Sequence, residues 1–348
     1  MAKINNSNFQ PDNPANFVAA LLKKLGQEEK IKVELEPVWK YVGRITRQDG
    51  AFTYFRGTNF DLNGQGSMEI ATDKSYAAYF LKQVGYRVIP GRTFYSPDFA
   101  KILKSPDGPE AAYRYAKTMG FPVIVKPNSA SQGKLVCLVH NKTDFTRAVK
   151  KICEIDRVFL VQPFIAGRDY RVVILDNEVI SAYERLPLSV TGDGVSTINR
   201  LLDNKQRDFR ARGRDTIIDK TDFRFDLKLK NNNLNRASVL AKGQIFALLD
   251  NRNLSTGGEA VDVTDKIHAS FKNLAINITR DMGLRYCGVD LMIRDDIKKP
   301  LNPKINNYHV IEINSAPGLD HYAESGVKQK KIVKEMYRKI LKKLAGYR

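Results

Sequence analysis

Residues 310–319 read VIEINSAPGL. The segment begins like a buried β-strand, yet it carries Glu312 and Asn314 and ends at a Pro-Gly turn. Side chains two positions apart face the same side of a strand, so Glu312 and Asn314 point the same way. A carboxylate and an amide oxygen side by side form half of a coordination shell for a hard cation. A solvated polar face on an edge strand is the alternative when this pair is taken alone.

A second apolar segment, 286–294, is expected to form an antiparallel hairpin with this strand. If Ile293 lies opposite His309, then Asp290 lies opposite Glu312, and directly opposed side chains share a face. The result would be one cluster of three oxygen ligands, which suits magnesium or manganese better than zinc. The connecting loop is long, so this register is a choice and not a deduction.

Two further segments carry residue types that bind phosphate. In VIVKPNSASQGK (123–134), a lysine ends an apolar strand and small residues follow, so an ammonium group and backbone N–H groups can approach phosphates together. In NLSTGGEAVDVTD (253–265), a donor-rich loop can close over a developing anion. The first of these segments lacks the GxxxxGK[ST] order of a Walker A loop. A surface hairpin and a surface turn are the alternatives. Four basic residues also occur near these segments, and no single one of them supports a functional assignment: Lys74, Arg168, Arg171 and Arg185.

The composition restricts the class of protein. The chain has 348 residues, 43% of them hydrophobic, which is enough for a large core in two or three subdomains. Its 57 Lys and Arg against 38 Asp and Glu give a formal charge of +19, which fits phosphates, an acidic peptide or polymer, nucleic acid or simple solubility. Because no nucleic-acid motif accompanies the charge, nucleic acid is not expected as a partner.

The cysteines and the N-terminal residues both indicate a reduced compartment. The three cysteines have no CxxC spacing, which argues against a disulfide framework or a zinc site. The N-terminal residues lack the apolar core of a signal peptide, and no apolar run reaches membrane-spanning length. We therefore expect a cytoplasmic protein without membrane contact.

The predicted elements mix helices and strands without strict alternation. Helices are expected at 72–85, 108–120 and 266–283, and three strands with tight turns are expected within 157–187. Residues 30–70 give no assignable pattern. The expected class is therefore α+β with largely antiparallel sheets.

Six motifs follow one another along the chain, and their order resembles a known superfamily. They are DK (73–74), VIVKP with its small-residue loop, QPFIAGRDYR (162–171), NLSTGG (253–258), GVDLM (288–292) and VIEINSAPGL. Over roughly residues 70–326 this order resembles the ATP-grasp carboxylate–amine ligases. It is most similar to the ATP-grasp domain of cyanophycin synthetase and to the glutathione-synthetase domain of bifunctional glutathione enzymes. The segment ERLPLSVTGDGVSTINRLLDNKQRDFRARG (184–213) resembles the cyanophycin type.

The resemblance implies the ATP-grasp fold, in which two α+β subdomains grip a nucleotide, here preceded by a small N-terminal domain. It divides the chain into an N-terminal region (1–70), a first ATP-grasp segment (71–120), a small nucleotide-lid subdomain (121–167) and a large subdomain (168–348). The large subdomain would hold the metal site and the basic C-terminal helix.

The resemblance also implies three sets of functional residues. The nucleotide-binding set is Lys74, Lys126, Ser129, Ser131, Gly133, Gln162, Phe164, Ile165 and Asp169. The metal-binding set is Asp290, Glu312 and Asn314. The set facing the γ-phosphate or an acyl phosphate is Arg185, Arg252 and Asn253. In the first set the lysines contact phosphates, the small residues fold over them, the hinge at 162–165 holds adenine and the aspartate lies near the ribose. The first hinge residue is often Glu in the family and is Gln162 here.

The implied activity is an ADP-forming ligase that joins a carboxylate to an amine through an acyl phosphate, with ATP and Mg²⁺ or Mn²⁺ as cofactors. The substrates would be an amino acid or acidic peptide and an amine co-substrate. An ATP-dependent kinase on the same scaffold and a non-catalytic basic binding protein are the alternatives. The large additional domains of the relatives have no counterpart in this sequence, so a free-standing ligase is expected. Its oligomeric state, including a homo-oligomer, is left open.

Overall fold

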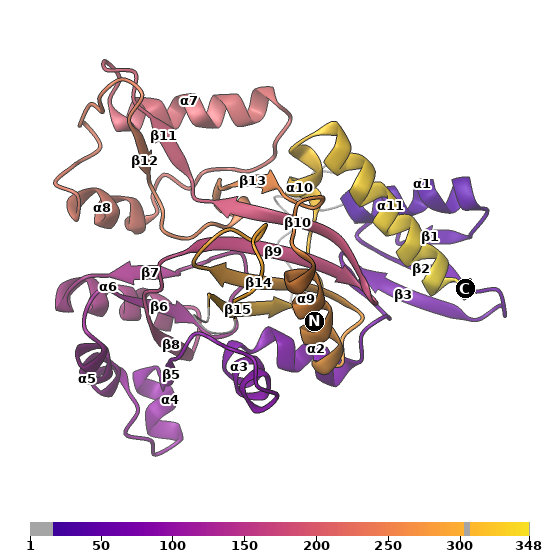
Figure 1. Ribbon diagram of the computed structural model, residues 1–348, viewed down its shortest axis with the longest axis horizontal. Coiled ribbons are helices and arrows are strands. Elements are labelled where there is room, and N and C mark those ends of the chain that lie inside the picture. Colours follow the sequence, from indigo (N-terminus) through magenta and orange to yellow (C-terminus); the bar gives the residue numbers. More distant parts are fainter. Residues whose placement is uncertain (1–16, 303–306, 348) are drawn as a thin grey trace.

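The computed structural model describes residues 17–302 and 307–347. Within them, three sheets and a two-stranded ribbon are connected by helices (Figure 1). All pairings between the strands are antiparallel. The predicted α+β class with antiparallel sheets is therefore confirmed.

The N-terminal region forms a small sheet that the sequence pattern did not reveal. After helix α1 (Phe17–Glu29), the strands pair in chain order: β1 (Val33–Leu35), β2 (Val42–Thr46), β3 (Phe52–Arg56) and β4 (Asn59–Phe60). These strands are only two to five residues long, so a period of two has little length in which to appear. Helix α1 buries Leu22 and Leu25 in a core shared with helix α11 (Val327–Leu344).

A second sheet has the strand order β5-β8-β6-β7. Its strands are β5 (Arg92–Tyr95), β6 (Val123–Pro127), β7 (Cys137–Val139) and β8 (Val158–Pro163), and its helices are α4 (Pro97–Ile102), α5 (Pro109–Met119) and α6 (Lys142–Cys153). Phe94, Phe145 and Phe159 fill the core between this sheet and its helices. The sheet therefore combines one strand from residues 71–120 with three from residues 121–167.

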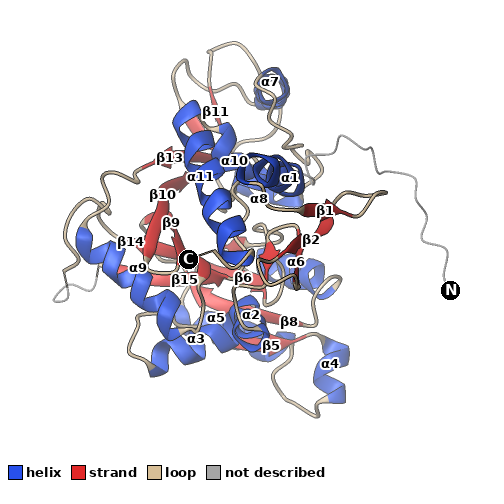
Figure 2. Ribbon diagram, turned by 90° about the vertical axis from the view of Figure 1, so that its right-hand side faces the viewer, coloured by secondary structure: helices blue, strands red, loops and turns tan. Residues whose placement is uncertain are grey.

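A five-stranded sheet with the order β13-β10-β9-β14-β15 forms the centre of the molecule. Its strands are β9 (Arg168–Leu175), β10 (Glu178–Leu186), β13 (Glu259–Asp262), β14 (Tyr286–Ile293) and β15 (Tyr308–Asn314). Helices cover both faces: α2 (Gln65–Thr72), α3 (Lys74–Gln83) and α9 (Ala269–Asp281) on one, α10 (Asp320–Glu324) and α11 on the other. Figure 2 shows α1, α10 and α11 grouped together.

The alternation of side chains along β9 explains why both faces are covered. Val172 and Ile174 belong to the core that contains Phe271 of α9, whereas Val173 and Leu175 belong to the core of α11. Successive residues of a strand face opposite sides. A strand that is apolar at every position therefore requires helices on both faces.

An insert between β10 and β13 forms a lobe of its own. It consists of β11 (Ser189–Thr191), α7 (Ile198–Ala211), α8 (Phe223–Lys230) and β12 (Ile245–Ala247). Its separate core includes Leu202, Phe209 and Phe225. The lobe projects at the upper left of Figure 1. A short 3₁₀ helix, η2 (Leu254–Thr256), follows the insert.

The hairpin of β14 and β15 has the predicted central pair but a different outer register. Asp290 lies opposite Glu312, as predicted. The expected pairing of Ile293 with His309 is wrong by one residue, because Ile293 lies opposite Tyr308. A β-bulge adds one residue to β15 between the two pairs and accounts for the difference.

Among the described residues, every helix is too short or too polar to cross a lipid bilayer. Helix α11 carries much of the basic charge, but many of its cations are used within the fold. Its ion pairs include Lys334–Glu28, Arg338–Glu28, Arg338–Glu29, Lys339–Glu178, Lys342–Glu29 and Lys343–Asp176. An unpaired basic face on this helix therefore does not account for the excess positive charge of the chain.

Candidate active site

Two adjoining cavities lie where the sheets meet. The first, of about 140 Å³, lies between the second sheet and the five-stranded sheet. The second, of about 390 Å³, is bordered by the N-terminal region, the five-stranded sheet and α10. Arg185, Asn253 and Glu312 line both cavities. A group bound at this boundary would therefore face both spaces.

The structure brings most of the predicted site residues to these cavities. Those lining the first are Lys74, Lys126, Gly133, Gln162, Phe164, Ile165, Asp169, Arg185, Arg252, Asn253 and Glu312. The second adds Ser131 and Asn314. Ser129 lines neither cavity, because its backbone N–H and hydroxyl both donate to the carboxylate of Asp156 at 2.8 Å. Asp290 is fully buried and contacts the arginines of the cavity wall.

Two lysines and Glu312 form the charged centre of the first cavity. Lys126 ends β6 and is 5% exposed, and Lys74 begins α3. The Lys74 ammonium lies 3.8 Å from the Glu312 carboxylate. Burial lowers the pKa of Lys126 to about 8. Burial acts to raise the pKa of Glu312, but Lys74, Lys126 and the nearby arginines prevail and lower it to about 2.

A buried network of carboxylates and guanidinium groups lies beneath this centre. Arg171 donates to both oxygens of Asp290 at 2.6 and 2.7 Å. Arg185 lies 2.8 Å from Asp290 and 2.7 Å from Asp169. Burial raises the pKa of Asp290, and the two guanidinium groups oppose that rise. Arg171 therefore fixes the floor of the site, a role that the sequence analysis did not assign to it.

The residues at the end of this hairpin fit a magnesium ion. Asp290, Glu312 and Asn314 supply only hard oxygen donors, as magnesium prefers. Within the described part of the chain, the buried side-chain nitrogen of Asn314 has no hydrogen-bond partner, so this amide is free to turn its oxygen to a ligand. Oδ1 of Asp290 contacts Arg171 alone and keeps a second lone pair for a ligand, whereas Oδ2 contacts both Arg171 and Arg185.

The small-residue loop is held down by side chains from outside the predicted motifs. The carbonyl oxygen of Gly133 accepts from Arg224 and from Asn251, each at 2.8 Å. A Cβ atom at Gly133, whose φ is +67°, would lie 2.6 Å from the Asn251 amide, so the position requires glycine. Arg224 comes from the insert, where no sequence signal marks it. It is 8% exposed and is held by the carboxylate of Asp222.

The loop that follows the insert is fixed in a similar way. The guanidinium of Arg214 donates to the carbonyl oxygens of Leu254 and Gly258. Arg252 donates to the carbonyl of Gly167 at 2.8 Å, and Asn253 caps η2 through its side chain. Arg252 and Asn253 therefore shape the loop as well as lining the cavity.

The hinge residues border the apolar part of the first cavity. Gln162 is 5% exposed, and its amide donates to the carbonyl of Ile89 at 3.3 Å. Phe164 and Ile165 line the same cavity, together with Met292 and other apolar side chains. An apolar slot with lysines at one end has the polarity of an adenine nucleotide.

Comparison with known proteins assigns the chain to a family. The profile of the RimK-like ATP-grasp domain matches residues 93–200 and 250–340, which is more than half of the chain. The glutathione biosynthesis bifunctional protein GshAB of Mannheimia succiniciproducens is 38% identical over 215 residues, 60% of this chain and 28% of that protein. Cyanophycin synthetase of Trichormus variabilis is 31% identical over 270 residues, 76% of this chain and 28% of that protein.

A solved structure has a similar fold. The crystal structure of a bifunctional glutathione synthetase from Pasteurella multocida matches with a TM-score of 0.57 and 27% identity, covering 92% of this chain and 43% of that one. The present chain spans less than a third of the curated relatives named above.

These matches confirm the resemblance and the fold that the order of the motifs predicted. The profile omits residues 201–249, which form most of the insert. On the strength of the match over both sides of the insert, this chain belongs to the RimK-like ATP-grasp family.

Proposed function

We propose that this protein is an ATP-dependent ligase that joins a carboxylate to an amine through an acyl phosphate. The observation that carries the proposal is the position of Glu312. Its carboxylate borders both cavities, faces the lysine pair of the first and lies opposite Asp290. A triphosphate and a substrate carboxylate are both anions, so a centre that brings them together needs fixed cations. Lys74 and Lys126 in the wall of the first cavity and Arg185 at the boundary of the two cavities supply these cations.

In this proposal the first cavity holds ATP. Its apolar wall receives the adenine, Asp169 approaches the ribose, and Lys74 and Lys126 hold the phosphates in line. With about 140 Å³ the cavity is smaller than the roughly 300–1,000 Å³ typical of ligand sites. The Lys74 ammonium donates to the carbonyls of Asn128 and Ala130 at 3.2 and 2.7 Å. The small-residue loop must therefore release this lysine when the phosphates enter.

The chemical step takes place at the boundary between the cavities. A substrate carboxylate attacks the γ-phosphorus, ADP leaves, and an acyl phosphate forms. Arg185 and Asn253 then stabilise the acyl phosphate and the oxyanion of its collapse. Arg252 and the loop at 253–258 close the site to water, because an acyl phosphate hydrolyses readily.

Asp290, Glu312 and Asn314 would hold the magnesium ion. When bound, this ion would neutralise the negative charge of the phosphates during phosphoryl transfer.

The substrate class follows from the relatives and from charge. The matched proteins are named for glutathione biosynthesis and for cyanophycin synthesis, so we infer that an amino acid or an acidic peptide supplies the carboxylate. The formal charge of +19 fits an acidic substrate.

The proposal is tested with ATP, magnesium and pools of amino acids and short peptides, with and without hydroxylamine. Hydroxylamine traps an acyl phosphate as a hydroxamate, which ferric chloride and mass spectrometry detect. We expect ADP, phosphate and a hydroxamate from at least one acid. A stable phosphate ester would indicate a kinase instead, and unchanged ATP with every pool would contradict the ligase assignment.

A further inference from the structure

The second cavity has a histidine in its wall that the nucleotide chemistry does not use. His321 lies in α10, just after the turn that follows β15, and its side chain is 15% exposed. The cavity also receives Tyr41 from the N-terminal region, Ser131 from the small-residue loop and Ser255 from η2. The wall is therefore largely polar and combines these parts of the chain with residues of the central sheet.

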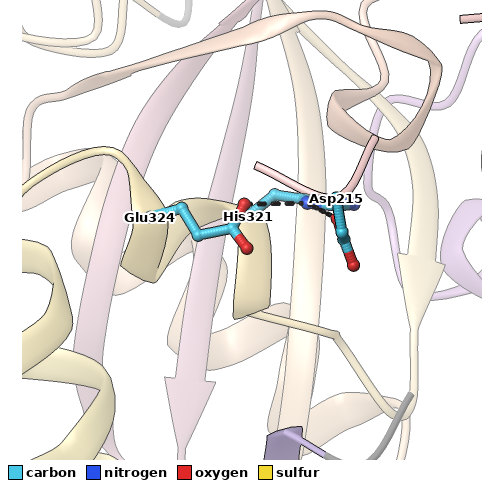
Figure 3. Close-up of side chains that lie close together, drawn as sticks. All are labelled: Asp215, His321 and Glu324. Carbon is cyan, nitrogen blue, oxygen red and sulfur yellow. Dashed lines mark hydrogen bonds and ion pairs between the residues drawn. The ribbon is translucent and has the colours of Figure 1, made fainter. Parts of the chain in front are cut away.

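Carboxylates hold one edge of the imidazole. The Nδ1 atom of His321 lies 3.5 Å from Asp215 Oδ1 and 3.4 Å from Glu324 Oε2, and Figure 3 shows the three side chains converging. Within the described residues the Nε2 atom makes no hydrogen bond. A carboxylate that accepts from Nδ1–H leaves Nε2 as a proton acceptor.

The charged groups around His321 come from two elements. Asp320 and Glu324 belong to α10, and Asp215 and Arg214 belong to the segment after α7. Two further elements pack against α10: η2, which contributes no titratable side chain, and α11, whose Tyr337 lies near Asp320. Burial lowers the pKa of His321, but Glu324, Asp320 and Asp215 outweigh it and raise the pKa above 6.5. Three carboxylates against one arginine surround His321, and Asp320 lines the cavity beside it, so this end favours a cation more than the end at Arg171 and Arg185 does.

An amine co-substrate brings such a cation and a chemical requirement. At neutral pH a primary amine is an ammonium ion, which has no lone pair for attack on an acyl carbon. It must first be bound next to the acyl phosphate and then lose a proton. The second cavity adjoins the first at Arg185, Asn253 and Glu312, where the acyl phosphate is proposed to form.

We propose that the second cavity binds the α-ammonium group of an amino-acid acceptor, and that His321 removes its proton. This inference rests on the proposed ligase activity. His321 takes one proton from the ammonium, and the freed nitrogen pair forms the C–N bond. The C–O bond to phosphate then breaks, its electron pair leaves on the phosphate, and the phosphate takes the second nitrogen proton. The imidazolium returns its proton to solvent.

The test compares two nucleophiles in His321→Gln. Hydroxylamine is mostly unprotonated at neutral pH and needs no base, whereas an amino-acid acceptor does. With an acid that gives a hydroxamate and an equimolar pool of the twenty amino acids, we expect hydroxamate formation within about twofold of the wild type. Amide formation at pH 7 should fall by about 10²–10³-fold. His140→Gln is the matched control, because His140 is exposed at the end of β7 and should leave both rates unchanged.

The pH profile provides a second readout. Wild-type amide formation should decline as the pH is lowered through a value above 6.5, and His321→Gln should lose this inflection. Asp215→Asn, which keeps the imidazole, should move the inflection to lower pH because one carboxylate that raises the His321 pKa is gone.

The outcomes separate this inference from the ligase proposal. No hydroxamate from wild type with any acid contradicts both. Hydroxamate without any amide from the amino-acid pool contradicts only the acceptor class. Equal loss of hydroxamate and amide in His321→Gln indicates a merely structural role, and unchanged amide formation removes His321 from the reaction.

Discussion

The two cavities differ in how their walls are assembled. The first is built from short segments in which neighbouring residues act together, such as 162–165 and 251–253. The second also contains runs of neighbours, such as 253–255 and 316–321, but it adds the N-terminal region, which no sequence pattern assigned, and residues of strands β9, β10 and β15. All members of a nucleotide-binding fold handle the same triphosphate, and a local motif can supply those contacts. Recognition of a particular acid or amine depends on which distant segments meet.

Their electrostatics differ in a way that matches this division. Around the first cavity, buried cations keep Glu312 ionised, since its pKa is about 2. At the far end of the second, carboxylates raise the pKa of His321. The first cavity therefore favours anions and the His321 end of the second favours cations, as a reaction between an anionic acyl phosphate and an ammonium ion requires. Three substitutions should distinguish the roles of the two cavities. They change Asp290 in the network beneath both cavities (the shared floor), Glu312 at their boundary, and Lys126 in the first cavity alone.

The largest effect is expected at the shared floor. Asp290→Asn removes the charge that Arg171 and Arg185 contact within 2.8 Å. Because this leaves buried guanidinium groups with too little negative charge, the free energy of unfolding should fall by about 3–5 kcal/mol. Urea unfolding followed by circular dichroism measures it.

The control for the floor is Asp49→Asn, which breaks the exposed pair with Arg47 and should cost less than about 1 kcal/mol. Equal stability of the two variants would show that the network does not support both cavities together.

The next effect is expected at the shared boundary. Glu312→Gln removes the charge that balances Lys74 and one of the proposed magnesium ligands. ADP release and hydroxamate formation should both fall by about 10²–10³-fold, because both depend on the transfer step. A coupled ADP assay and the hydroxamate assay measure the two rates.

Glu178→Gln, at an exposed pair with Lys339, is the matched control and should change neither rate. The melting temperature of Glu312→Gln confirms that the fold is intact. Full activity in Glu312→Gln would remove the proposed metal site and the comparison between the cavities.

The smallest effect is expected in the first cavity alone, from pH. Lys126 binds phosphate only when protonated, and its pKa of about 8 means that the protonated fraction falls between pH 7 and pH 9. Affinity for a non-hydrolysable ATP analogue should therefore fall by about tenfold over this range.

Lys126→Arg keeps a permanent charge at this position, so its affinity should change little with pH. Isothermal titration calorimetry at three pH values with both proteins makes the comparison. A wild-type affinity that stays constant to pH 9 would show that Lys126 does not contact the phosphates.

Most of the first cavity was predictable, and little of the second was. The pair of Asp290 with Glu312 could be predicted because the period of a strand is two and the apolar residues fix which side is buried. The outer register could not, because a bulge adds a residue without changing the pattern of apolar side chains. Arg224 and Arg214 could not be found either, since each acts through a carbonyl oxygen that any residue offers.

The sequence by itself indicated the family and the two lysines through the order of its motifs, and it predicted the oxygen-bearing hairpin through the period of its strands. Only the tertiary structure decided that Arg171 and Arg185 share Asp290, that the insert holds the small-residue loop, and that Asp215 meets His321. Those contacts join residues between 91 and 119 positions apart, and no local energy term encodes them. They exist because packing of separate cores brings the segments together.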